Sequence, residues 1–558
     1  MSTTGESAPR PFAAYAVAGL VWAWFAWRFD FICDDAFISF RYSHHLAEGS
    51  GLVYNTAREV PVEGYSNFLW VVWLSLFERL GCDITAAARW SSLLAGGLLL
   101  CLTMKTVERR LSLDVGGLTA TGLFLASLPA FGLWSTGGLA TMASALAIFG
   151  VLYALHGNEE GPRLVPAVLC AAAATLLRAD GIGYLGLILA ATFAISAEDA
   201  VLRQRMRSAA VITAASIATV FIAHAVWRHG YYGEWVPNTA KIKAGLTTAR
   251  LHRGLLYVGA FIITLPAIAV GALIGLRRWR EGPLPLLMAC ALLVGGSFGY
   301  SIYVGGDFMP FGRFLVPALP AVALLFAWGW SRLAPKPAWA LASLCVIASA
   351  AEAYNYGPAP RELRAMYDFR FRGESFQTEV ERWDDMKKNA AAWNLWGRAI
   401  AEHVSPEESI ILGGLGAIGY HAPDLTIYDT YGLVTPIVLG HAEPKKSAAP
   451  GHDVEVSRFL FIRPAIRESL PQAPAYFGAM VDLGRPLEAG ESLPEWIIST
   501  DNLKDIERFI SADDLKDLND GLRENDYDAT LSEEVYKLDP AQGFPKDSIL
   551  RLLRINYD

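Results

Sequence analysis

The chain has 558 residues, of which 53% are hydrophobic and only 18% are charged, with a formal net charge of −8 at pH 7. Soluble proteins carry about 25% charged residues, and the deficit falls on roughly the first 350 residues. The composition therefore predicts an integral membrane domain at residues 1–353 and a soluble α/β domain at residues 354–558. The acidic balance gives no reason to expect a nucleic-acid partner. The six cysteines show neither a CxxC pair nor zinc-ligand spacing.

Apolar runs recur along the first domain, beginning with residues 12–29. This first run follows a single Arg and precedes no small-residue cleavage site, so we predict a retained span rather than a signal peptide. Short basic loops at 105–110, 203–207, 277–280 and 332–336 are cytoplasmic by the positive-inside rule. If the runs at 66–77 and 90–104 both crossed after the first span, the basic loop at 105–110 would lie outside. We therefore predict that the run at 66–77 does not cross and lies at the outer interface. About eleven spans result, with the C-terminal domain outside the membrane.

On this topology the polar, glycine-rich and aromatic segments collect on the outer face. They are Asp34 with Asp35, residues 62–67, residues 134–138, Arg178 with Asp180, residues 231–243 and residues 305–313. The cytoplasmic loops are short and merely basic. We therefore expect the chemistry to take place on the outer side.

The neighbouring aspartates Asp34 and Asp35 stand where the first span ends, before an amphipathic segment closed by Gly49. One of them has a plain explanation as a helix N-cap. The other interpretation is a carboxylate that deprotonates a hydroxyl nucleophile, with a pKa raised in surroundings poor in water. A doublet permits both. Two carboxylates would also suit a divalent cation, although no further ligand pattern supports a metal site.

The residues that follow the doublet have competing interpretations. Arg41 lies two turns after Asp34 on the same helix face, where an ion pair and a phosphate contact are equally good explanations. The adjacent histidines His44 and His45 point about 100° apart on a helix, which disfavours a shared metal.

Two outer loops combine aromatic and charged residues. In YYGEWVPNTAKIK, Tyr232, Asn238, Lys241 and Lys243 suit either an aromatic belt at the membrane surface or a sugar and its phosphate. In GGDFMPFGR, Asp307 and Arg313 bracket an aromatic stretch. An Arg at a membrane boundary can snorkel, but its planar fork also suits a lipid-linked phosphate.

GGLGAIGY formally matches a dinucleotide-binding fingerprint with Gly414, Gly416 and Gly419. The context argues against it, because Pro423 interrupts the following helix and Asp429 comes only ten positions after Gly419. We interpret SIILG and LTIYD as a strand, a tight turn and a second strand.

Several motifs in fixed order carry a family resemblance. They are DDAFISFRY, GLVYN, VEGYSNFLW, YYG with PNTAK, GGDFMPFGRFLVPALP, YDTYGLVTP, and Gly451-His452. This set resembles the GT-C membrane glycosyltransferases, and among them the group of the mycobacterial terminal β-(1→2)-arabinofuranosyltransferase. The resemblance covers most of the membrane half and about half of the C-terminal domain. One departure is Ala140, where relatives carry Glu in a Gly-Leu-Glu-Thr motif, which places the sugar or the acceptor in doubt.

The resemblance implies transfer of a sugar, arabinofuranose first of all, from a polyprenyl-phosphate donor to a cell-envelope glycan with inversion. Asp34 would be the base with Asp35 beside it, in a bacterial cytoplasmic membrane with the catalytic side facing out. The leaving phosphate would meet cationic groups such as Arg313, Lys241 and Arg178. The candidate donor and phosphate residues are Arg313, Lys241, Lys243, Arg178 and Asp307, and the candidate substrate residues are Tyr65, Asn67, Tyr232, Asn238 and His452.

Three alternatives stay open. The transferred sugar can be another one, such as mannose or aminoarabinose, passed to glycan, lipid or protein. A lipid-linked-sugar transporter would place ionisable groups at mid-membrane and often shows repeated halves, neither of which the sequence displays. A non-catalytic scaffold that binds envelope glycan is the third.

Overall fold

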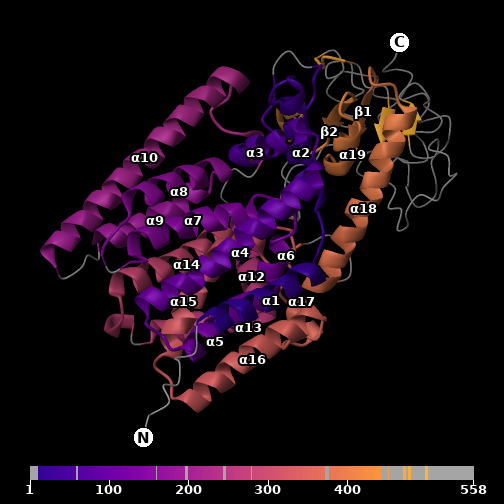
Figure 1. The fold of residues 1–558 in the computed structure, drawn as a ribbon. Coiled ribbons are helices and arrows are strands. Elements are labelled where there is room, and N and C mark those ends of the chain that lie inside the picture. The colour runs from indigo at the N-terminus through magenta and orange to yellow at the C-terminus, as the bar shows by residue number, and fades with distance from the viewer. Residues whose placement is uncertain are drawn as a thin grey trace, which may run out of the picture.

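The computed structural model describes residues 11–57, 61–158, 160–194, 199–242, 247–277, 279–370, 376–440, 450–451, 461, 469–472, 476–478 and 497–499. A tall bundle of helices carries a small α/β unit at one end (Figure 1). The bundle helices are α1 (Phe12–Arg28), α4 (Ile84–Arg110), α5 (Val115–Ala126), α6 (Pro129–Trp134), α7 (Thr141–His156), α8 (Leu164–Leu177), α9 (Gly181–Ala194), α10 (Ala200–Tyr232), α12 (Thr248–Thr264), α13 (Pro266–Leu276), η1 (Trp279–Glu281), α14 (Leu284–Val304), η2 (Arg313–Ala318), α15 (Leu319–Trp330) and α16 (Pro335–Ala353).

Four segments of the described chain are long and apolar enough to cross a membrane. They are α4, α10, α14 and the continuous stretch Arg313–Trp330. The pair α12 and α13 passes the same test together but bends by 90°, at Pro266, where the ring removes a helix hydrogen bond. Shorter apolar helices are α5, α7, α8 and α9. These segments confirm a polytopic helical membrane protein, whereas the count of about eleven spans stays a prediction.

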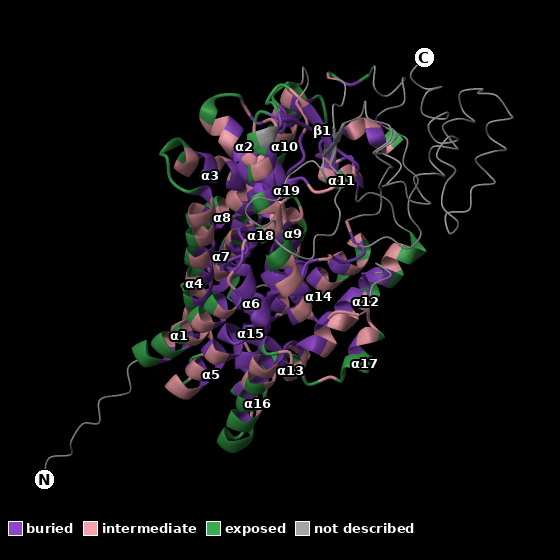
Figure 2. Cartoon of the chain, turned by 90° about the vertical axis from the view of Figure 1, so that its right-hand side faces the viewer, coloured by how far each residue is buried: buried purple, intermediate pink, exposed green. Residues whose placement is uncertain are grey.

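The interior of the bundle is apolar. Every residue of α15 is buried, and Phe326 of this helix stacks on Phe124 of α5 with ring centroids 4.3 Å apart. Figure 2 shows the buried residues concentrated in the middle of the bundle and the intermediate and exposed ones on its outer sides and ends.

Three short helices lie near the α/β unit: α2 (Asp34–Glu48), α3 (Phe68–Arg79) and α11 (Asn238–Ile242). α3 lies beside α2 at that end of the bundle (Figure 1). Its 12 residues are too few to cross a bilayer, which needs about 20. The bundle helix α5 is equally short, so length alone does not decide the matter, and the position of residues 66–77 at the outer interface stays a prediction.

The predicted domain boundary at residue 353 falls where α16 ends. α17 (Arg361–Ala365) follows, and then α18 (Glu379–His403), which runs along the bundle to the α/β unit (Figure 1). Thr378 and Glu381 form a capping box at the start of α18, which satisfies free N–H groups of its first turn.

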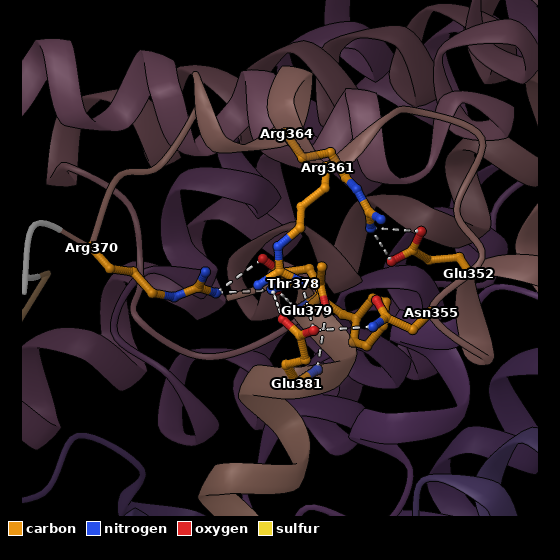
Figure 3. Close-up of polar contacts among 9 residues, drawn as sticks. Glu352, Asn355, Arg361, Arg364, Arg370, Thr378, Glu379 and Glu381 are labelled. Atoms are coloured by element: carbon orange, nitrogen blue, oxygen red, sulfur yellow. Dashed lines mark hydrogen bonds and ion pairs between the residues drawn. The ribbon is translucent and has the colours of Figure 1, made fainter. Parts of the chain in front are cut away.

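A polar network fastens the start of α18 to the bundle (Figure 3). The Arg370 Nη2 donates to both Glu379 oxygens at 3.1 Å, and Glu379 Oε2 also accepts from the Phe311 N–H at 2.5 Å. Two further ion pairs join Arg361 to Glu381 at 2.7 Å and Arg364 to Glu352 at 3.1 Å. The loop that carries Asp307 and Arg313 is thus held in part from the C-terminal side of the chain.

The α/β unit comprises β1 (Ser409–Leu412), α19 (Gly416–His421), β2 (Thr426–Asp429), η3 (Pro436–Gly440), β3 (Tyr476–Gly478) and β4 (Ile497–Ser499). The strand order is β2-β1-β3-β4; β1 is parallel to β2 and β3, and β3 is antiparallel to β4. The expected tight turn between the first two strands is wrong. Parallel strands need a crossover connection, and α19 provides it.

Candidate active site

A cavity of about 1260 Å³ lies where the bundle, α18 and the α/β unit meet. Its wall contains seven of the candidate residues from the sequence: Asp34, Asp35, Tyr65, Asn67, Arg178, Asp307 and Arg313. They come from segments far apart in the chain, so the fold gathers most of the predicted outer-face motifs around one space. Ala140, at the position of the family glutamate, also lines it.

Three candidates lie away from the cavity wall. The Tyr232 hydroxyl donates to the Leu52 carbonyl at 2.9 Å. The Asn238 amide donates to the Leu433 carbonyl at 3.1 Å, and Lys241 forms an ion pair with Glu234 at 2.7 Å. Within the described chain, Tyr232 and Asn238 make internal hydrogen bonds and Lys241 makes a partly exposed ion pair, and none of the three lines the cavity. The remaining candidates, Lys243 and His452, lie outside the described residues.

Asp34 joins the two halves of the molecule. It is the first residue of α2, yet its carboxylate makes no cap on that helix. Its two oxygens accept instead from the N–H groups of Gly416 at 3.2 Å and Ala417 at 2.7 Å, so Asp34 caps α19. Burial raises the pKa of the Asp34 carboxyl to about 7, although these amides lower it and the neighbouring Asp35 raises it further.

Arg41 binds the other end of the same helix. Its side chain is fully buried and makes hydrogen bonds within the described chain to the carbonyls of Tyr54, Gly419, Ala422, Pro423 and Leu425 and to the Asn55 side chain. Both the ion pair and the phosphate contact considered for Arg41 are therefore replaced by a structural role. A carboxylate at the N-terminus of α19 and a guanidinium at its C-terminus both match the helix dipole.

The glycines of the false fingerprint have a packing role. A Cβ at Gly416 would overlap the backbone oxygen and carboxylate of Asp34, and one at Gly419 would overlap the Tyr54 hydroxyl. Both glycines lie on the face of α19 that approaches α2. Close helix packing explains the spacing that resembles a nucleotide-binding loop.

Two arginine–aspartate pairs lie on the bundle side of the cavity. Arg313 contacts Asp307 through Nε at 2.6 Å and Nη2 at 3.1 Å. Arg178 contacts Asp180 through Nε at 2.8 Å and Nη2 at 2.5 Å. Each guanidinium carbon is within 5.4 Å of the Phe314 ring centroid, at 5.3 Å for Arg313 and 5.4 Å for Arg178.

Each bidentate contact uses two of the five N–H donors of its guanidinium group. The planar forks are thereby oriented, and the contacts of the described residues leave further donors that suit an anionic oxygen. Asp35 acts electrostatically on Arg313, so the second aspartate of the doublet belongs to this charged side of the site.

Asp429, at the end of β2, also lines the cavity. Its carboxylate accepts from the N–H groups of Leu433 at 2.6 Å and Val434 at 2.9 Å, which closes the YDTYGLVTP turn. Burial raises its pKa.

The α18 helix contributes cavity residues that sequence reasoning missed. They include Asp385, Asn389, Trp393 and Trp396. Their spacing of three to four residues in WDDMKKNAAAWNLW was the available signal, but a polar helix with scattered tryptophans looks the same on an ordinary surface.

Among the described residues, no group of three or more His, Cys, Asp or Glu side chains is arranged to hold a metal ion. His44 contacts Glu78 at 2.9 Å and Glu48 at 3.2 Å, and His45 faces the Val53 carbonyl at 2.8 Å. The adjacent histidines thus have separate partners.

Comparison with solved structures identifies the architecture. ArnT from Cupriavidus metallidurans bound to undecaprenyl phosphate superposes with a TM-score of 0.51 at 15% identity, over 78% of this chain and 89% of that chain. The apo state of the same protein gives a TM-score of 0.50 at 15% identity, over 79% and 88%. The chain has the GT-C fold.

Three further comparisons play no part in the GT-C assignment. The archaeal oligosaccharyltransferase AglB from Archaeoglobus fulgidus, in complex with an inhibitory peptide and a dolichol-phosphate, is similar with a TM-score of 0.48 at 12% identity, over 76% of this chain and 64% of that chain. Residues 380–529 match a family described as a domain of unknown function, DUF8728. No curated protein matches the chain significantly.

Proposed function

We propose that the protein is a membrane glycosyltransferase that takes a sugar, arabinofuranose first of all, from a polyprenyl-phosphate donor. It passes this sugar to a hydroxyl group of a cell-envelope glycan. The observation that supports the proposal most directly is the cavity of the GT-C fold, where an aspartate doublet and two oriented guanidinium groups share one wall. The undecaprenyl phosphate bound by ArnT has the same lipid-phosphate chemistry as the proposed donor.

In the proposed reaction the acceptor hydroxyl oxygen attacks the anomeric carbon of the donor. The new carbon–oxygen bond forms as the bond to the phosphate oxygen breaks, so the anomeric configuration inverts and polyprenyl phosphate leaves. The hydroxyl proton passes to Asp34. Its two bonds to the amides of α19 fix its orientation, and a pKa of about 7 suits a general base at neutral pH.

Arg313 and Arg178 provide the positive charge for the leaving phosphate. Because each is oriented by an aspartate, little rearrangement is needed when the phosphate charge develops. Asp35 is the neighbour of the proposed base in the chain and also interacts electrostatically with Arg313 of the proposed phosphate site.

The test measures release of polyprenyl phosphate from polyprenyl-phosphoryl arabinofuranose by purified protein with a short arabinan acceptor. We expect turnover by wild type and a loss of about 10² to 10⁴ fold in kcat for Asp34→Asn, with donor binding retained. If Asp35→Asn loses kcat and Asp34→Asn does not, the base is Asp35. No release by wild type from this donor or from its mannose analogue would contradict the proposal.

A further inference from the structure

The two faces of α18 line two different cavities. Asp385, Asn389, Ala392, Trp393 and Trp396 border the large cavity. Lys387, Ala390, Asn394 and Arg398 border a smaller one of about 780 Å³. Successive residues of a helix turn by about 100°, which places these sets on opposite sides of α18. We call the first set the inner face of α18.

The inner face differs in chemistry from the bundle side of the large cavity. The bundle side carries the paired guanidinium groups that suit a phosphate. The inner face offers the Trp393 indole, the Asn389 amide and the carboxylate of Asp385, which accepts a hydrogen bond from the Gln377 side chain, whereas the Trp396 ring is buried in an apolar core. Two cations of α18 also border the large cavity, and each has a partner: Arg382 donates to the Gln377 side chain at 3.3 Å, and Lys388 forms an ion pair with Asp384 at 2.7 Å. Indole rings stack on the C–H face of a sugar ring, and amide and carboxylate groups bond to its hydroxyls.

The size of the cavity is also informative. Small-molecule sites typically enclose about 300–1,000 Å³, and the large cavity has about 1260 Å³. It has room for a second sugar beside the one attached to the phosphate.

We propose that the inner face of α18 binds the acceptor, a neutral glycan, through Asn389 and Trp393. The proposal rests on the proposed function and extends it. It assigns binding of the acceptor, whose identity the sequence leaves open, to a helix of the segment that matches the domain of unknown function. α18 begins at Glu379 and the matched family begins at residue 380. The first helix of that domain is then an acceptor-recognition element.

The experiment separates acceptor recognition from donor chemistry. The probe is the methyl glycoside of an α-(1→5)-linked arabinofuranose tetrasaccharide, and donor hydrolysis without acceptor is measured in parallel. For Asn389→Ala and Trp393→Ala we expect the KM for the probe to rise about tenfold. Donor hydrolysis should stay within about twofold of wild type.

Two matched controls come from the same helix. Lys387→Ala and Arg398→Ala alter the opposite face, so their KM for the probe should equal that of wild type. Trp393→Phe keeps an aromatic ring for stacking and should restore much of the affinity lost in Trp393→Ala.

Saturation-transfer NMR on the full-length protein measures binding of the probe and so tests the acceptor site independently of turnover. Unchanged binding and KM in both inner-face variants would overturn the proposal, and loss of binding in the control variants would transfer the acceptor to the smaller cavity. A wild-type protein that binds the probe but releases no polyprenyl phosphate would contradict the proposed function and leave the acceptor site supported.

Discussion

At the scale of single residues, Asp34 combines two roles. Its carboxylate accepts hydrogen bonds from the amides of α19, and in the proposed reaction it also accepts the proton of the acceptor hydroxyl. Because burial raises its pKa to about 7, the charged form needed to accept a proton is depleted in mild acid. We expect kcat/KM to rise with pH up to about 7 and then level off. The rate–pH profile measures this, and the residual rate of Asp34→Asn should show no such step.

The same pKa acts on stability in the opposite direction. The folded value of about 7 lies above the ordinary value of 3.8, so the folded state holds this proton more tightly. Its contribution to the free energy of unfolding is therefore complete below about pH 4 and is lost as the pH rises to about 7. Thermal unfolding across this range should show a steeper decline for wild type than for Asp34→Asn, and equal slopes would contradict the assigned pKa.

Arg313 is the second residue with a testable role. Arg313→Lys keeps the positive charge but cannot form the bidentate contact with Asp307. We expect the KM for the donor to rise about tenfold, since one oriented hydrogen bond to the phosphate is lost. Arg332→Lys is the control, because Arg332 does not line the large cavity and its ion pair with Glu281 is long, at 3.9 Å. Equal donor KM values for the two variants would remove Arg313 from the phosphate site.

At the scale of elements, the docking of α19 on α2 depends on small residues and a buried cation. Gly416→Ala or Gly419→Ala would introduce a Cβ that overlaps Asp34 or Tyr54. We expect a loss of about 1–3 kcal/mol in stability together with lower activity. Gly183→Ala in α9 is the matched control, because no described atom lies within 4 Å of its added Cβ. Thermal unfolding of the three variants tests the difference.

The sequence predicted which motifs gather at the site better than it predicted which groups their side chains contact. It placed the doublet Asp34 and Asp35, Arg178, and the Asp307–Arg313 loop on one face, and the structure gathers them around one cavity. It did not predict that Asp34 would cap a helix 382 residues away, because hydrogen bonds between distant segments leave no periodic trace. Tyr232 and Asn238 showed the opposite error, since a polar side chain used for internal contacts looks the same in sequence as one that faces a ligand.

The crossover between β1 and β2 was missed for a physical reason as well. Strands of only four residues and a helix of six are too short for a clear hydrophobic period. Pro423 suggested a turn, and it does end α19, but only after a full helical segment had formed. The glycines that argued for a turn permit close packing instead.

At the scale of the whole molecule, the orientation in the membrane is a prediction from basic loops. Cys82 is exposed and borders the smaller cavity together with residues of α18, so it lies on the same side as the C-terminal segment. A membrane-impermeant maleimide should therefore label Cys82 in intact cells, and labelling should disappear in Cys82→Ser. A cysteine introduced at Arg332 should react only after the cells are opened. The reverse pattern would invert the topology.

The contacts of Asp34 and Arg41 with α19 join an early part of the chain to one that is synthesised much later. All of the bundle helices precede residue 354, so a ribosome can complete the membrane part of the chain while the amides of Gly416 and Ala417 are still unmade. Until they arrive, the carboxylate of Asp34 lacks the two amide partners that it has in the described structure, and one side of the cavity is missing. A chain broken off before residue 416 would thus contain both arginine–aspartate pairs of the bundle but not the α19 amides that orient Asp34.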